Sequence, residues 1–66
     1  MATILTVTDS KGISVSTWGK ENITLVAGDT LEQNSLGGVS FKGKMLNLGK
    51  DILGKLIAHK RVEVMN

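Results

Sequence analysis

Hydrophobic residues alternate with small polar residues along most of the chain. Residues 13–18 (ISVSTW) show this period most clearly, and residues 3–8 (TILTVT) add an excess of β-branched side chains. A period of two places the hydrophobic side chains on one face of a β-strand, and β-branched residues favour strands. The pattern therefore predicts short strands at residues 3–8, 13–18, 23–25, 39–41, 45–48 and 62–65.

Turn residues separate the predicted strands. Residues 9–12 (DSKG) combine aspartate, serine and glycine, which is typical of a turn with a positive φ angle. Residues 30–36 leave two alternatives open: Asp29 could cap one helical turn with Glu32 completing a capping box, or the segment could form a further strand. The two glycines at 37–38 end this segment in either case.

The period changes after residue 49. Ile52, Leu53, Leu56 and Ile57 have the spacing of one helix face, and basic residues gather where they would favour a helix C-terminus. Gly54 costs such a helix about 1 kcal/mol relative to alanine. The segment is therefore predicted as either a short amphipathic helix or a continued strand.

These elements predict an all-β or mainly β chain, with a short C-terminal helix as the open alternative. Glycine-punctuated strands recur every six to ten residues, which fits a small β-barrel, a β-helix or an intertwined stem. Only one tryptophan and one phenylalanine are present, which favours a slim aliphatic core shared between chains. We expect a single domain, with a strand-rich body at residues 1–49 and a basic docking segment at residues 50–66.

The length of the chain makes self-association an expectation. A protein of 66 residues without cysteine cannot add disulfides to a small core, and one histidine makes a structural metal site improbable. Association with copies of the same chain, or with a larger assembly, is the stabilising device that remains. We expect the oligomer core to consist of aliphatic and aromatic strand residues, namely Ile13, Val15, Ile23, Leu25, Val39 and Phe41.

A resemblance to a known class of proteins appears between residues 12 and 48. The elements GISVS, NITLVAGDTL and GGVSFKG resemble the rungs of phage baseplate spikes and of type VI secretion needle-tip proteins, whose triple-stranded β-helices repeat such patterns. The resemblance implies a homotrimeric, non-enzymatic element of a virion, tail or baseplate, in contact with other proteins of the particle. Many phage spikes end in a His-x-His pair that binds iron, whereas His59 is followed by Lys60 and Arg61, so no metal site is carried over.

The charge distribution keeps a second function open. Residues 42–66 hold six of the eight basic side chains but two of the six acidic ones. A small β-barrel with such a basic half could bind nucleic acid by stacking bases on an aromatic ring and pairing lysines with phosphates. The residues of this alternative basic face are Trp18, Lys42, Lys44, Lys50, Lys55, Lys60 and Arg61.

Enzymatic functions have little support in the sequence. Residues 49–55 have the spacing G-x-x-x-x-G-K of a phosphate-binding loop, but Leu56 occupies the position of the serine or threonine that holds magnesium. We therefore expect no catalytic residues, no metal and no cofactor. No apolar run is long enough to span a membrane, so we expect the protein in a virion or assembled particle, or otherwise in the cytoplasm.

Overall fold

A computed structural model describes residues 2–65 and shows a mainly β fold with one short helix. This confirms the mainly β class predicted from the alternating pattern. The strands are β1 (Thr3–Val7), β2 (Ile13–Ser16), β3 (Asn22–Leu25), β4 (Thr30–Gln33), β5 (Val39–Phe41), β6 (Lys44–Met45) and β7 (Val62–Val64), and the helix is α1 (Lys50–Ala58).

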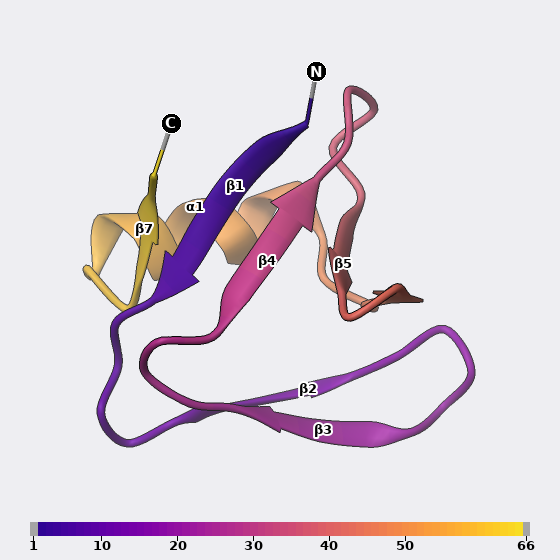
Figure 1. Cartoon of the computed structure of the whole chain (residues 1–66), viewed down its shortest axis with the longest axis horizontal. Coiled ribbons are helices and arrows are strands. Elements are labelled where there is room, and N and C mark those ends of the chain that lie inside the picture. The colour runs from indigo at the N-terminus through magenta and orange to yellow at the C-terminus, as the bar shows by residue number, and fades with distance from the viewer. Residues whose placement is uncertain (1, 66) are drawn as a thin grey trace.

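Five of the strands form an open antiparallel sheet in the order β6-β5-β4-β1-β7 (Figure 1). β1 lies near its centre, with Leu5 opposite Leu31 of β4 and Val7 opposite Val62 of β7. The first and last strands of the chain are therefore neighbours. Because the sheet is open, a closed barrel is not confirmed, and an intertwined trimeric stem stays a prediction.

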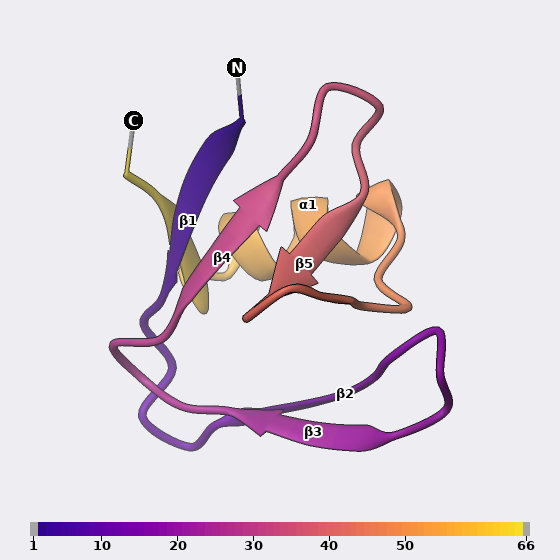
Figure 2. The same cartoon turned by 45° about the vertical axis from the view of Figure 1, so that its right-hand side comes forward.

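The remaining two strands, β2 and β3, form a separate hairpin below the sheet (Figures 1 and 2). A bridge between Thr17 and Leu46 attaches the far end of this hairpin to the segment that follows β6. Two hydrogen bonds flank the bridge: the Trp18 amide donates to the Met45 carbonyl at 3.0 Å, and the Asn47 amide donates to the Ser16 carbonyl at 2.7 Å. The hairpin is thus held at a fixed position relative to the sheet.

The segment after residue 49 forms a helix, one of its two predicted alternatives. α1 follows Gly49 and covers one face of the sheet (Figure 2). Leu53 and Leu56 are buried against the sheet, whereas Ile52 and Ile57, predicted on the same apolar face, are exposed. Within residues 2–65 no helix is long and apolar enough to cross a membrane.

Residues 30–33 form strand β4, which settles the second pair of alternatives in favour of a strand. Asp29 does not cap a helix. Its carboxylate accepts a hydrogen bond from the Val26 amide at 2.8 Å and so stabilises the turn before β4. Pairing with both β1 and β5 gives this segment more hydrogen bonds than one isolated helical turn could make.

One hydrophobic core unites the sheet, the hairpin and the helix. Its buried members are Leu5, Val7, Ile13, Leu25, Leu31, Val39, Leu46, Leu48, Leu53, Leu56 and Val62. Of the residues predicted for an oligomer core, Ile13, Leu25 and Val39 are buried here, and Val15, Ile23 and Phe41 pack against them. The first three are therefore covered by their own chain, and the other three are only partly buried by it. The C-terminal segment also contributes to this core, through α1 and β7.

Candidate functional site

Strand β7 is an outer strand of the sheet, and one of its edges is free. The Thr8 amide donates to the Arg61 carbonyl at 2.8 Å, and the Met65 amide donates to the Ile4 carbonyl at 2.8 Å. Since antiparallel strands direct alternate residues to one neighbour, the amides and carbonyls of Val62 and Val64 point away from β1. Among the described residues no strand lies on that side of β7.

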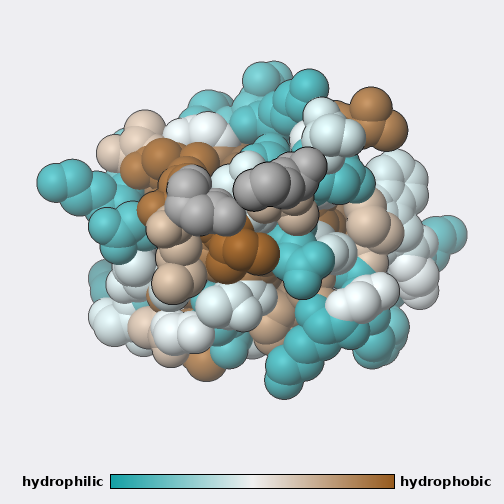
Figure 3. All heavy atoms as spheres, turned by 45° about the horizontal axis from the view of Figure 1, so that its top comes forward, coloured by the Kyte–Doolittle hydropathy of each residue, from teal (hydrophilic) through white to brown (hydrophobic). Residues whose placement is uncertain are grey.

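Hydrophobic side chains surround this free edge. Val64 and Met65 are 45% and 62% exposed, and Ile57 of α1, which lies beside β7, is 38% exposed. Ile57, Val62 and Val64 line a surface hollow of about 400 Å³. Figure 3 views the molecule from the end where β1 begins and β7 ends, and shows hydrophobic side chains gathered among hydrophilic ones. We call β7, Ile57 and Met65 the β7 edge.

Contacts with the turn before β2 hold β7 in place. Arg61 forms an ion pair with Asp9 through its Nε atom, and the Thr8 hydroxyl donates to the Lys60 carbonyl at 2.7 Å. Lys60 has a φ angle of +59°, so the backbone leaves the extended conformation just before β7. The strand available for pairing is therefore short and begins at Val62.

The Asp9 carboxylate makes the stability of this corner sensitive to acid. Its pKa is lowered, chiefly because the Lys11 amide donates to it at 2.9 Å and also because Arg61 pairs with it. A lowered pKa in the folded state adds stability above the unfolded pKa of about 3.9 and loses it as the pH falls through the folded value.

Replacing Asp9 with asparagine should therefore reduce the dependence of stability on pH below about pH 4. The change removes the charge but keeps an oxygen that can accept the Lys11 amide. Urea unfolding at pH 7 and at several values below pH 4 measures the effect. The wild type should lose stability faster than D9N on acidification, and parallel losses would contradict this role of Asp9.

The structure separates the residues predicted for a basic face. Trp18 is 70% exposed, and its amide donates to the Met45 carbonyl at the end of β2 that is attached to the sheet. Arg61 lies at the opposite end of β2, where its Nη2 atom is 3.4 Å from the Gly12 carbonyl. Lys50 and Lys55 project from α1, and Lys60 follows it. The seven residues therefore occupy several separate places, and nucleic-acid binding by them stays a prediction.

Several of these cations already have partners within the chain. Lys44 forms a salt bridge with Glu21 at 3.1 Å, and Arg61 is paired with Asp9. The Lys42 ammonium lies 5.2 Å from the centre of the Phe41 ring, within range of a cation–π contact. These contacts neutralise or hold charges that a polyanion would need, so the basic face offers less free charge than the sequence alone implies.

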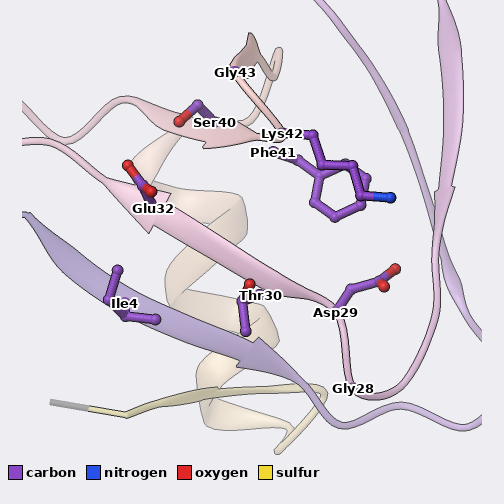
Figure 4. Close-up of a pocket in the computed structure, with 9 residues that line it drawn as sticks. All are labelled: Ile4, Gly28, Asp29, Thr30, Glu32, Ser40, Phe41, Lys42 and Gly43. Carbon is purple, nitrogen blue, oxygen red and sulfur yellow. The ribbon is translucent and has the colours of Figure 1, made fainter.

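A second hollow, of about 330 Å³, lies on the face of the sheet opposite α1 (Figure 4). Ile4, Glu32 and Ser40 rise from neighbouring strands on one side of it, and Asp29 and Lys42 lie toward the hairpin. The Asp29 carboxylate is already used in the turn before β4. Within residues 2–65 no three histidine, aspartate or glutamate side chains gather as metal ligands would. The described side chains around this hollow thus show no arrangement typical of a catalytic or metal site.

Comparison with known proteins found no relative: no family model, no curated protein and no solved structure matches this chain. The interpretation of the free edge of β7 as a functional site therefore depends on the structure alone.

The period-two pattern predicted a strand at residues 62–65, but it could not show that this strand lies at the margin of the sheet. The signal that was present is the apolar pair Val64 and Met65, which follows the last predicted alternation toward the C-terminus.

Proposed function

We propose that this chain is a non-enzymatic structural protein that associates with copies of itself through the β7 edge, as a component of a larger protein assembly. The observation that carries the proposal is the unpaired outer side of β7, flanked by exposed Ile57, Val64 and Met65. An unpaired strand edge next to apolar side chains is a template for pairing with another strand. The virion or baseplate setting is supported by the sequence resemblance alone.

Two copies of β7 pair best in antiparallel orientation about a two-fold axis at Glu63. In this register Val62 of one copy lies opposite Val64 of the other, so the outward amides and carbonyls of both residues find partners. Shifting the register toward Lys60 loses bonds, because Lys60 is not extended and its carbonyl already accepts from Thr8. The register centred on Glu63 therefore makes the most hydrogen bonds within the described residues.

The side chains on the two faces of this paired sheet act in opposite directions. On the α1 side, Val64 of each copy is brought against the apolar surface formed by Val62 and Ile57, which removes hydrophobic area from water. On the other side, Glu63 faces its counterpart, and like charges directly opposite one another weaken strand pairing. Association is therefore modest for an isolated pair and gains strength where an assembly supplies further contacts.

Replacing Val64 with proline tests the proposal, because proline removes the outward amide that the second copy would use. That amide does not bond to β1, and proline is tolerated at edge strands with this orientation, so the fold should persist. By symmetry two intermolecular hydrogen bonds are lost, which should weaken self-association about ten-fold or more. Sedimentation velocity over a series of protein concentrations measures the change, and circular dichroism checks the fold.

A matched pair of helix variants locates the interface independently of the strand. Ile57 lines the hollow beside β7, whereas Ile52 is also exposed on α1 but lies at a different surface. Ile57→Glu should weaken self-association, and Ile52→Glu should leave it unchanged. A wild-type chain that is monomeric at every concentration would overturn the proposal, as would an oligomer that V64P and I57E leave intact.

A further inference from the structure

The outer strand of the β2–β3 hairpin has a free edge of its own. In both views of the fold β2 lies on the side of the five-stranded sheet, and β3 lies on the far side of the hairpin (Figures 1 and 2). Among the described residues no strand pairs with the outer side of β3. We call the outward side of Asn22–Leu25 the β3 edge, and it is a different surface from the β7 edge.

The backbone groups at the β3 edge belong to Asn22 and Thr24. The Thr17 amide donates to the Glu21 carbonyl at 2.8 Å, which continues the register between β2 and β3. Since antiparallel strands direct alternate residues to one neighbour, the odd-numbered residues of β3 direct their backbone groups to β2. The amides and carbonyls of Asn22 and Thr24 therefore point away from β2, and within residues 2–65 no strand or turn pairs with them.

The side chains of β3 do not protect this edge from pairing. Unpaired edge strands in native proteins often carry a charged residue, a proline or a bulge. Residues 22–25 (NITL) contain no charge and no proline, and their register with β2 runs without a bulge. Ile23, at the centre of the strand, is half-buried and packs against the core. The β3 edge is therefore open to a further strand, whereas β7 carries the charge of Glu63 at its centre.

We propose that the β3 edge pairs with β3 of a second copy of this chain, in antiparallel orientation about a two-fold axis at Ile23. In this register Asn22 of one copy lies opposite Thr24 of the other, so all the outward amides and carbonyls of both residues find partners. The two hairpins then form one continuous sheet. Ile23 lies opposite its counterpart, and this aliphatic pair stabilises the contact by removing apolar surface from water.

A second copy of β3 fits this edge better than the other free strand of the chain does. If β7 of a second copy paired with β3, its Glu63 would lie opposite Ile23, and a charge would face an aliphatic side chain. In the pair of β3 strands the nearest charged residue within the extended backbone, Glu21, lies opposite Leu25. The pairing ends at Lys20, whose φ angle of +68° turns the backbone away. No two like charges therefore face each other across the axis.

Together with the β7 edge, the β3 contact links copies into a row. This extension rests on the proposed function, because a β3 contact alone joins only two copies. The two strands lie at different margins of the molecule, β7 at one side of the sheet and β3 at the outside of the hairpin (Figure 1). In the variant V64P, which lacks the β7 contact, the association that remains should stop at a pair.

Single cysteines test the β3 contact on the full chain, which contains no cysteine of its own. Ile23→Cys places one thiol opposite its counterpart in a non-hydrogen-bonded pair, a separation that a disulfide can span. Val15→Cys is the matched control, because Val15 lies opposite Ile23 on β2, is likewise half-buried and lies one strand further from the axis. In air with a copper–phenanthroline catalyst, I23C should form covalent dimers at least ten-fold faster than V15C, as measured on non-reducing gels.

Two lysine variants of I23C test the edge itself. Thr24→Lys should slow the cross-linking several-fold, because a lysine at an edge strand opposes pairing and lies diagonally across from its counterpart. Ser14→Lys should leave the rate unchanged, since Ser14 is also exposed but lies on β2, opposite Thr24. Equal rates for I23C and V15C, or for the two lysine variants, would overturn the β3 contact.

Glu63→Cys reports on the β7 edge separately, because Glu63 lies on the axis proposed there. Cross-linking of E63C without cross-linking of I23C would overturn the β3 contact and leave the β7 edge in place. The reverse result would support the β3 contact and count against the β7 edge. In urea that unfolds the chain, the advantage of I23C over V15C should disappear, which shows that the reaction depends on the folded edge.

Discussion

Replacing Leu25 with alanine is expected to lower the free energy of unfolding by about 3 kcal/mol, because the side chain is fully buried and its removal leaves a cavity. A chain of 66 residues has a total stability of roughly 3–10 kcal/mol. The substitution therefore removes a large part of it. Urea unfolding followed by far-ultraviolet circular dichroism measures the loss.

The neighbouring Val26 supplies the control for this substitution. Its side chain is 53% exposed, so Val26→Ala should change stability by less than about 0.5 kcal/mol. A loss at Leu25 no larger than the loss at Val26 would contradict the position of Leu25 in the core.

The same unfolding experiment distinguishes a core formed within one chain from a core shared between chains. Leu25 belongs to the set predicted for an oligomer core, yet in the structure it is buried entirely by residues of its own chain. A core within one chain gives an unfolding midpoint that does not depend on protein concentration, whereas a shared core makes the midpoint rise with concentration. We expect at most a weak dependence, from pairing at the β7 edge.

Much of the secondary structure could be predicted because strand periodicity is a local property. The alternation at residues 13–18 and the β-branched residues at 3–8 identify β2 and β1 directly. The order of the strands is not local, since β1 pairs with β7 and with β4, which lie far away in the sequence. The hydrophobic pattern within one strand does not indicate which other strand pairs with it.

The candidate sites were less predictable, because they depend on which surfaces remain uncovered. Trp18 ends the alternating segment at residues 13–18, yet its side chain is 70% exposed. Ile52 and Ile57 have the spacing of a buried helix face, yet only Leu53 and Leu56, at the centre of that face, reach the sheet. The apolar face of α1 is wider than the surface it covers: Ile57, at one margin, belongs to the β7 edge, and Ile52, at the other margin, stays exposed.

Substituting alanine for glycine at two positions is expected to produce changes of opposite sign. Gly12 has a φ angle of +85°, and a Cβ atom there would lie 3.2 Å from the Leu25 carbonyl oxygen, which belongs to the backbone of β3. Gly12→Ala therefore combines an unfavourable backbone conformation with a close contact that cannot rotate away. We expect a loss of about 2 kcal/mol in the free energy of unfolding.

Gly54 is the matched case without either constraint. It lies inside α1, and a Cβ atom there would meet nothing within 4 Å. Alanine is preferred over glycine in a helix because it restricts the unfolded chain, so Gly54→Ala should raise stability by about 1 kcal/mol. Urea unfolding of both variants measures the difference, and changes of the same sign would contradict the left-handed turn at Gly12.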